Sequence, residues 1–263
     1  MMGDDTESLS DFQRESGKVS PSAKSLQFLS KRRLMDLIMR LLLSFLVIAV
    51  LNLPAQEAPP ALTEYLGRQI AQTMHWKGAE WLMRRVREQE EGPSKMREQL
   101  QVKPGMVICD MGCGNGYHTL PLAEMVGDKG KILAVDVQPE MIEMLRQNIE
   151  RKGLKNIEPI NGLYHDPKLP PNTCDMILLV DVYHEFSHPV QMLASMRAAL
   201  KSDGQLVLVE FRAEDDSVPI KPEHKMTKVQ IHKEMKANGF ELKREYDGLP
   251  WQHLMFFGKT DMK

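Results

Sequence analysis

The sequence predicts an α/β fold in which helices cover both faces of a mainly parallel β-sheet. From about residue 101 onward, apolar runs of strand length alternate with helical patterns, and this alternation is typical of parallel sheets. The run 174–182 is almost entirely apolar, as expected for a central strand that is buried on both faces. A turn with three glycines joins the first strand to the next helix. The 263 residues suffice for one such domain with extensions.

The first strand and its glycine turn, VICDMGCGNGY at 107–117, form the most informative stretch. The strand closes on Asp110, and Gly112, Gly114 and Gly116 follow at alternate positions. Because glycine lacks a Cβ and tolerates positive φ, this turn brings the backbone close to a ligand. The next helix offers its free N–H groups and the positive end of its dipole to an anionic group. The stretch therefore predicts a binding site for a nucleoside cofactor.

The spacing of the glycines distinguishes between two possible cofactors. Dinucleotide-binding loops read GxGxxG, whereas here the third glycine comes one residue early and Tyr117 stands in the place of the last one. The second strand, 131–137, carries Asp136 near its C-terminal end, where a carboxylate can accept both hydroxyls of a ribose. We therefore expect S-adenosylmethionine rather than NAD, and an NAD-dependent oxidoreductase remains an alternative.

The second helix and the strands after it continue the alternation. This helix begins at Pro139 and ends at Gly153, because proline suits a first helical turn and glycine suits a C-cap. The next elements are a short strand near 156–161, the buried strand 174–182, a helix over 189–200 and a strand over 205–211.

The C-terminal part adds one helix and two strands. Thr227 and Gln230 form a capping box for a helix that ends at Asn238 and Gly239. The strands near 240–247 and 252–258 are close enough in sequence to pair antiparallel.

Four motifs carry a resemblance to a known family. DMGCGNG, VDVQPEM, CDMILLVDVYHEF and LKSDGQLVLVEF, within about 101–259, resemble the class I S-adenosylmethionine-dependent methyltransferases. The similarity is to the branch near the ubiquinone and menaquinone biosynthesis methyltransferases and their uncharacterised bacterial relatives. It implies a Rossmann-like seven-stranded sheet with one reversed strand, and S-adenosylmethionine as the cofactor. It says little about the acceptor.

The expected cofactor site lies across the carboxyl ends of the strands. The residues expected to bind the cofactor are Asp110, Gly112, Cys113, Gly114, Gly116, Asp136, Val137, Gln138, Gly162, Leu163 and Asp181. The first five would line its methionine end, Asp136 would hold the ribose, and Val137 and Gln138 would border the adenine. The resemblance places residues 162–164 at the adenine edge. Asp181 is expected to meet the cofactor's amino group.

The segment DVYHEFSH contains a literal HExxH, the zinc-binding pattern of many hydrolases. That pattern needs both histidines on a regular helix, but Pro189 disfavours helical geometry at His188. We therefore expect no metal. Tyr183, His184 and Glu185 are instead candidates for a catalytic base, and a structural role for His184 or Glu185 remains equally open.

The expected reaction is a direct displacement, for which the protein chiefly aligns the acceptor with the methyl group and excludes water. The acceptor is expected to be a small molecule or a lipid-like compound. Lys221, His224 and Lys225, in the loop 212–226, are candidates to meet it or are solvated loop charges. A cofactor-binding protein without transferase activity is a further alternative.

The chain divides into four parts by composition. Residues 1–30 read as a disordered tail, 31–56 as a signal peptide or membrane anchor, 57–100 as a helical cap, and 101–263 as the methyltransferase domain. In the second part, basic residues precede the uncharged run LLLSFLVIAVLNL, and translation is expected to begin at Met35 or Met39. These features predict membrane association or export, with a cytoplasmic location as the alternative.

The cap, over 61–101, is expected to form an amphipathic pair of helices. The resemblance implies that this segment covers the cofactor and shapes the acceptor pocket. The candidates for its walls are Tyr65, His75, Trp76, Trp81 and Arg84, with helix packing as the alternative for each. A net charge of −2 gives no general attraction for nucleic acid, which is not an expected partner. The three cysteines, Cys109, Cys113 and Cys174, read as small buried residues. The oligomeric state is left open.

Overall fold

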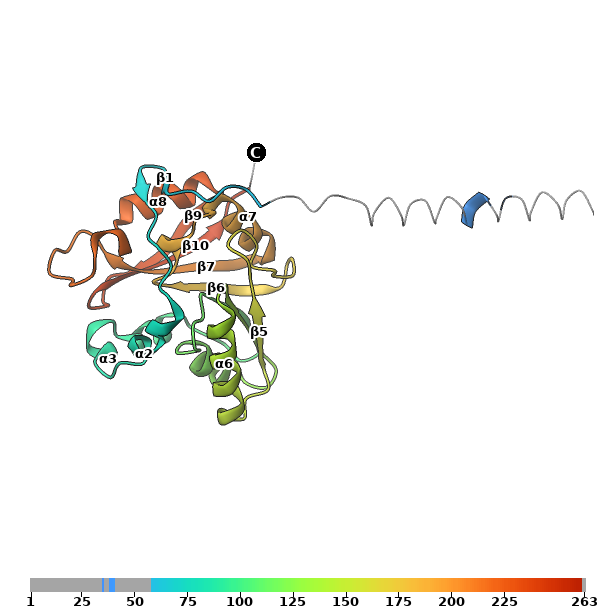
Figure 1. Ribbon diagram of the computed structural model, residues 1–263, viewed down its shortest axis with the longest axis horizontal. Helices are drawn as coiled ribbons and strands as arrows, with labels where there is room; N and C mark the ends of the chain where they lie inside the picture. The colour runs from blue at the N-terminus through green and yellow to red at the C-terminus, as the bar shows by residue number, and fades with distance from the viewer. Residues whose placement is uncertain (1–34, 36–37, 41–57, 262–263) are drawn as a thin grey trace, which may run out of the picture. The chain divides into compact units, whose positions relative to one another are not determined.

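The computed structural model describes Met35, residues 38–40 and residues 58–261 (Figure 1). The chain divides into two compact units, 1–57 and 58–263, and all the elements below belong to the second unit. The predicted tail at 1–30 lies outside the described residues, as does most of the predicted signal or anchor at 31–56. No helix among the described residues has the length and apolar character needed to cross a membrane.

The sheet confirms the predicted fold class. Its strand order is β5-β4-β3-β6-β7-β10-β9, and a two-residue strand, β8, pairs with β7. The bounds are β3 (Val107–Met111), β4 (Lys131–Asp136), β5 (Ile157–Asn161), β6 (Cys174–Val180), β7 (Leu200–Arg212), β8 (Lys225–Met226), β9 (Phe240–Tyr246) and β10 (Gln252–Lys259). Strands β3 to β7 are parallel to one another, and β10 runs antiparallel to both β7 and β9. The carboxyl ends of the parallel strands therefore share one edge.

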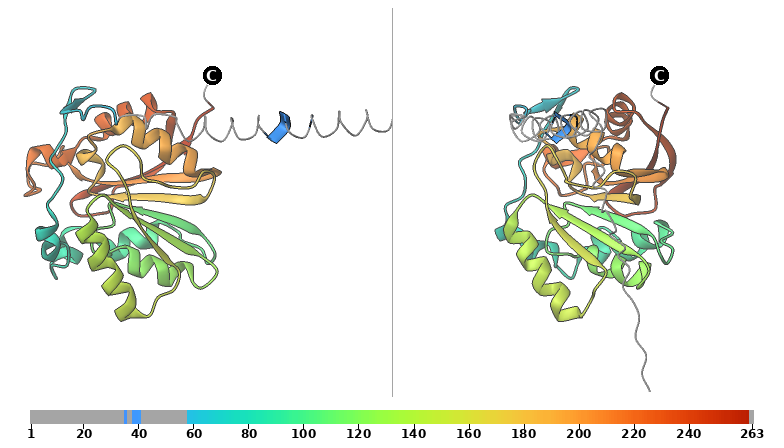
Figure 2. Two further views of the ribbon diagram at one scale, coloured as in Figure 1. Left: turned by 45° about the vertical axis from the view of Figure 1, so that its right-hand side comes forward. Right: turned by 90° about the vertical axis from the view of Figure 1, so that its right-hand side faces the viewer.

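Helices cover both faces of the sheet (Figure 2). The four longest are α5 (Thr119–Val126), α6 (Pro139–Lys152), α7 (Pro189–Ala199) and α8 (Lys228–Ala237). Helices α7 and α8 contribute to one hydrophobic core, whereas α5 and α6 contribute to another. In β6, Ile177 lies in the first core and Leu178 in the second, and neither is exposed to solvent. This alternation explains why the run 174–182 is apolar at nearly every position.

The predicted helix ends are observed. Pro139 is the first residue of α6, and Gly153 ends it with a left-handed φ of 67°. The Oγ1 atom of Thr227 accepts a hydrogen bond of 3.1 Å from the backbone N–H of Gln230 at the start of α8. Local sequence thus sets these ends. Strand β7 begins at Leu200, earlier than predicted, because this residue already pairs with Cys174.

The segment before β3 differs from the expected pair of amphipathic helices. It begins with a hairpin of β1 (Glu64–Tyr65) and β2 (Arg68–Gln69). Short helical elements follow residues 70–75: η1 (Trp76–Gly78), α2 (Ala79–Leu82), α3 (Arg87–Glu90) and α4 (Pro93–Gln99). The apolar spacing alone did not indicate how this part of the chain is divided.

Residues 68–76 form several hydrogen bonds with the main domain. The backbone N–H of Ala71 donates to the carbonyl of His184 at 3.1 Å, and that of Met74 donates to Glu185 Oε1 at 3.2 Å. The side chain of Gln138 accepts from the N–H of Trp76 and donates to the carbonyl of Met74. These contacts account for the absence of a regular helix over residues 70–75, and we call residues 68–76 the crossing segment.

Candidate functional site

A cavity of about 500 Å³ opens at the carboxyl ends of β3, β4, β6 and β7. Seven residues expected at the cofactor site line it: Gly112, Gly114, Asp136, Val137, Gln138, Leu163 and Asp181. They come from four separate stretches of the chain, which the shared edge of the sheet brings together. Tyr164 also borders the cavity.

The glycine turn packs tightly against its surroundings. Gly112 has a φ of 71°, and a Cβ there would lie 2.4 Å from Cγ2 of Val182. A Cβ on Gly114, whose φ is 53°, would lie 2.9 Å from Cδ1 of Leu82. Both positions therefore need glycine on conformational and steric grounds.

Asp136 joins the glycine turn to the end of β4. Its Oδ2 atom accepts from the N–H of Gly114 at 3.0 Å, and its Oδ1 atom accepts from the N–H of Gln138 at 2.9 Å. Burial raises the pKa of this carboxyl group, and these backbone hydrogen bonds oppose that effect. A carboxylate oxygen has a second lone pair, so both oxygens remain able to accept from a ligand hydroxyl.

Asp110 does not line the cavity, contrary to expectation. Its Oδ2 atom accepts a hydrogen bond of 2.5 Å from Thr119 Oγ1, at the first residue of α5. Burial raises the pKa of Asp110 to about 6. Through this hydrogen bond, Asp110 stabilises the connection between the glycine turn and α5.

Three further cofactor candidates are also absent from the cavity wall. Cys113 belongs to the hydrophobic core beside α5 and α6. Gly116 packs near Leu145, and Gly162 packs near Val135. These three residues pack against the framework around the cavity instead of lining it.

Asp181 combines backbone strain with an unmatched acceptor. It has a φ of 51°, which is uncommon for a residue with a Cβ and is often found at functional sites. Its Oδ2 atom accepts from Gln252 at 2.7 Å. Its buried Oδ1 atom has no hydrogen-bond partner among the residues that the structure describes. Burial, with the nearby carboxylates of Glu91 and Glu210, raises the pKa of Asp181 well above its usual range. The site thus presents a buried acceptor that a ligand N–H group could satisfy.

Arg87 is a cavity residue that sequence reasoning missed. It lies in α3, is buried, and donates from Nε to Glu91 at 2.5 Å and from Nη1 to the carbonyl of Leu82 at 3.0 Å. Its positive charge lowers the pKa of Asp181, against the larger effect of burial. The sequence offered Arg84 instead, but that side chain stacks on Trp81 at 3.6 Å and pairs with Glu90 and Glu91.

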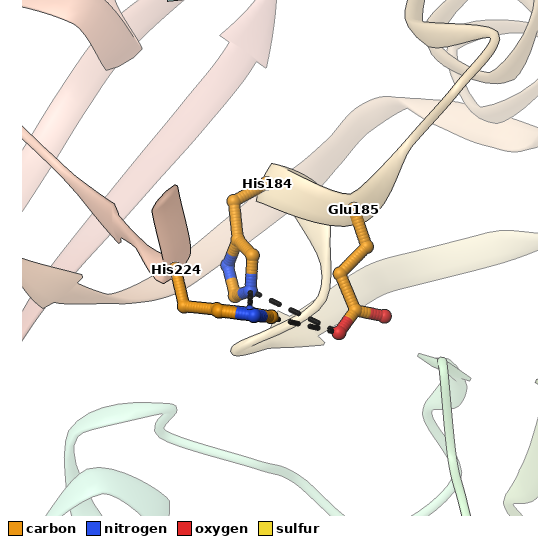
Figure 3. A group of neighbouring side chains, drawn as sticks. All are labelled: His184, Glu185 and His224. Carbon is orange, nitrogen blue, oxygen red and sulfur yellow. Dashed lines mark hydrogen bonds and ion pairs between the residues drawn. The ribbon is translucent and has the colours of Figure 1, made fainter. Parts of the chain in front are cut away.

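A second group of polar side chains lines the other part of the cavity wall: His184, Glu185 and His224 (Figure 3). The first two belong to η2 (Tyr183–Glu185), just after β6, and His224 ends η3 (Pro222–His224), in the loop after β7. His184 Nε2 lies 3.0 Å from His224 Nδ1. Glu185 Oε1 lies 4.0 Å from the first of these atoms and 3.9 Å from the second. We call these three residues the His-Glu cluster.

The buried carboxylate of Glu210 orients the imidazole ring of His184. The Nδ1–H group of His184 donates to Glu210 Oε2 at 2.5 Å, and Glu210, on β7, is fully buried. This bond leaves His184 Nε2 directed at His224 (Figure 3). Burial raises the pKa of Glu185 to about 7. The cluster is therefore a preorganised set of nitrogen and oxygen donors with a fixed tautomer at His184.

Tyr183 was predicted with His184 and Glu185, but the structure places it elsewhere. Its side chain is fully buried, and its hydroxyl donates to Glu234 Oε2 at 2.7 Å. It is not part of the cavity wall, so a role as a catalytic base is not supported by its position. His188 also lies apart: it precedes α7 with a φ of −130°, and its Nε2 lies 2.7 Å from the carbonyl oxygen of Pro59. The non-helical backbone predicted at His188 is observed, and only residues 183–185 form a short 3-10 helix.

The remaining candidates divide between the cavity and the framework. Lys221 and His224 line the cavity, whereas Lys225 donates to the carbonyls of Asp215 and Val218. Trp81 lines it as well, but the other proposed pocket walls do not: Tyr65, His75, Trp76 and Arg84.

Comparison with known proteins matches residues 102–254 to a family model described as a methyltransferase domain. A demethylmenaquinone methyltransferase from Bacillus cereus is 28% identical over 111 residues, which cover 42% of this chain and 47% of the relative. A protein-L-isoaspartate O-methyltransferase from Methanococcoides burtonii is 30% identical over 115 residues, with coverages of 43% and 53%. The matches thus span about half the length of these curated relatives.

Solved structures agree on the fold. A SAM-dependent methyltransferase from Aquifex aeolicus has a TM-score of 0.66 and 25% identity, and the match covers 70% of this chain and 98% of that one. A protein named as the [4+2]-cyclase SpnF has a TM-score of 0.51 and 20% identity, over 59% of this chain and 58% of its own. The second comparison indicates the fold alone.

Proposed function

Because the chain belongs to the methyltransferase domain family, we propose that it transfers a methyl group from S-adenosylmethionine to a small-molecule or lipid-like acceptor. The observation that carries this proposal is the cavity, where Asp136, the glycine turn and Asp181 converge at the carboxyl edge of the sheet. When bound, this cofactor supplies a methyl group that its sulfonium centre already activates. The residues of the chain then have to bind the cofactor and the acceptor, orient them, and exclude water.

The nucleoside end of the cofactor fits the β4 side of the cavity. The two oxygens of Asp136 would accept from the ribose hydroxyls while keeping their bonds to Gly114 and Gln138. Val137 and Leu163 would border the adenine with apolar surface. An NAD-dependent oxidoreductase is the weaker candidate, because the glycine spacing departs from the dinucleotide pattern.

The amino-acid end of the cofactor would bind at Asp181 and Arg87, which both line the cavity. The unmatched Oδ1 of Asp181 would accept from the ammonium group, and the guanidinium of Arg87 would attract the carboxylate. Both groups line the same cavity, so together they provide an acceptor for the ammonium group and a guanidinium for the carboxylate. The other residues of the cavity wall would then contact the acceptor.

The remaining space favours an acceptor that is largely apolar. Met74, Phe186, Phe211 and Ile220 line it, and the His-Glu cluster and Lys221 provide its polar groups. This lining supports a compound with an apolar body and one ionisable group, and the similarity to a demethylmenaquinone methyltransferase supports the same class of acceptor. An isoaspartyl group, which is polar and carried on a peptide chain, suits this largely apolar lining less well.

The test is calorimetry with S-adenosylmethionine, S-adenosylhomocysteine and NAD, followed by mass spectrometry for a gained methyl group. We expect binding of the first two and no binding of NAD. Incubation with membrane and soluble extracts should then yield a methylated product that depends on the enzyme. Binding without any product would favour the cofactor-binding protein, and binding of NAD alone would favour the oxidoreductase.

A further inference from the structure

The His-Glu cluster has the composition of a metal site. Its three donor atoms, His184 Nε2, His224 Nδ1 and Glu185 Oε1, lie within 4.8 Å of one another. The three atoms are 3.0, 3.9 and 4.0 Å apart. Two ligand atoms that each lie about 2.0–2.1 Å from a tetrahedral ion are roughly 3.3 Å apart, so one observed distance is slightly shorter than this and two are longer. Among the residues that the structure describes, no other group of three His, Cys, Asp or Glu residues is arranged in this way.

The surroundings support the same interpretation. His184 donates its second ring N–H to the buried Glu210, and this carboxylate–histidine arrangement orients metal-binding imidazoles in known sites. The bond fixes the tautomer in which Nε2 carries the free lone pair. Without an ion, the two imidazole nitrogens face each other at 3.0 Å, and one of them has to carry a proton.

We propose that His184, Glu185 and His224 bind one Zn²⁺-type divalent ion whose open coordination position faces the cavity. Two imidazoles and one carboxylate favour a borderline ion such as Zn²⁺ over Mg²⁺ or Ca²⁺, which take mainly oxygen ligands. Three protein ligands leave a position open, as in catalytic zinc sites. All three residues line the cavity, so that position is accessible to a ligand.

If the chain transfers a methyl group as proposed above, the metal site also indicates the chemical class of the acceptor, namely an alcohol or a phenol. An acceptor hydroxyl or phenol would bind the ion as an oxyanion, and its proton would pass to solvent. Lowering the pKa of a bound oxygen is a known effect of such ions. The cluster would then prepare an oxygen nucleophile, and His184 would act as a ligand instead of a proton acceptor.

The experiment measures zinc retained by the full chain, without a polyhistidine tag, after chelator treatment, zinc loading and gel filtration. A competing chromogenic chelator gives the affinity. His224→Ala removes a ligand whose side chain is 26% exposed on a surface turn, so the fold should tolerate it. His165→Ala is the matched control, because it removes one partly exposed histidine outside the cluster.

We expect about one zinc per chain for the wild type and for His165→Ala, and no retention of Mg²⁺. Affinity should fall at least tenfold in His224→Ala and in Glu185→Gln. Glu210→Gln should lower it about 10- to 100-fold, as loss of an outer partner usually does. Circular dichroism checks that each variant is folded. A wild type that retains no zinc, or equal affinity in His224→Ala and His165→Ala, would overturn the site.

Binding of S-adenosylhomocysteine, measured on the metal-free proteins, separates this proposal from the previous one. Zinc binding without binding of this nucleoside would support the metal site and contradict the proposed function. Nucleoside binding without zinc would contradict the metal site alone.

Discussion

Asp136 is the side chain on which binding of the ribose most directly depends. Asp136→Asn removes the charge that would accept the two hydroxyls, and hydrogen bonds to charged groups contribute about 1.5–3 kcal/mol. We expect the affinity for S-adenosylhomocysteine to fall about 10- to 100-fold, as measured by calorimetry. Asp128→Asn, at an exposed turn, is the control for the loss of one charge. Unchanged affinity in Asp136→Asn would contradict the assignment.

Asp110 predicts a pH dependence of stability. Its pKa is about 6 in the folded protein, against an ordinary value of 3.8, because burial disfavours the ionised form. The folded state therefore binds the proton more tightly than the unfolded state does. Stability should consequently fall as the pH rises from about 4 to 6, by an amount on the order of 3 kcal/mol from this group.

Asp110→Asn isolates the effect, because it retains an acceptor for Thr119 and cannot ionise. Urea unfolding at pH 5 and pH 7.5 gives the free energy of unfolding of the variant minus that of the wild type. We expect this difference to be larger, in favour of the variant, at pH 7.5. Other titrating groups cancel in this comparison. An equal difference at both pH values would show that Asp110 ionises normally.

At the scale of elements, a buried ion pair attaches the β1–β2 hairpin to α8. Arg68 donates from Nε to Glu234 Oε1 at 2.7 Å and from Nη1 to the carbonyl of His184 at 2.9 Å, and Glu234 also accepts from Tyr183. Both charged side chains are almost inaccessible to solvent. The pair therefore positions the hairpin beside η2.

Glu234→Gln leaves the Arg68 charge buried without its partner, which usually costs about 3–5 kcal/mol. We expect a loss of that size in the free energy of urea unfolding. Combining Glu234→Leu with Arg68→Met should recover much of it, because neither charge remains. A loss below about 1 kcal/mol in the single variant would mean that water reaches Arg68.

The crossing segment marks the limit of sequence reasoning at this scale. The glycine turn and Asp136 could be located from the sequence because adjacent residues in regular elements fix their positions. Arg87 could not, since it reaches the cavity through a segment whose path depends on packing against distant residues. His224 was a candidate, but the sequence did not indicate that it lies beside His184. Tyr183 and His184 are neighbours that face opposite ways after β6, and the turn that separates them has no clear signal.

At the scale of the whole molecule, the site lies within one of the two compact units. Every residue of the cavity wall falls between Thr73 and His224, inside the unit formed by residues 58–263. A chain shortened to 58–263 should therefore bind S-adenosylhomocysteine within about twofold of the full chain, since the coupling between separate units is usually small. Calorimetry on both proteins measures this.

The same pair of proteins tests the predicted signal or anchor at 31–56. The full chain should fractionate with membranes or be exported, and the shortened chain should remain in the soluble cell fraction. Identical fractionation of the two would contradict the interpretation of that apolar run. The membrane prediction rests on the sequence pattern alone, because the order of basic and apolar residues is its only support.

The crossing segment touches both ends of the cavity. Met74 donates to Glu185 on the acceptor side, while Met74 and Trp76 share Gln138 on the nucleoside side. One short length of backbone thus links two binding events, and such linkage has to be reciprocal. Binding of either molecule should therefore change the affinity for the other, and by the same factor. Amide hydrogen exchange over residues 70–76 should slow when S-adenosylhomocysteine binds, including at Met74.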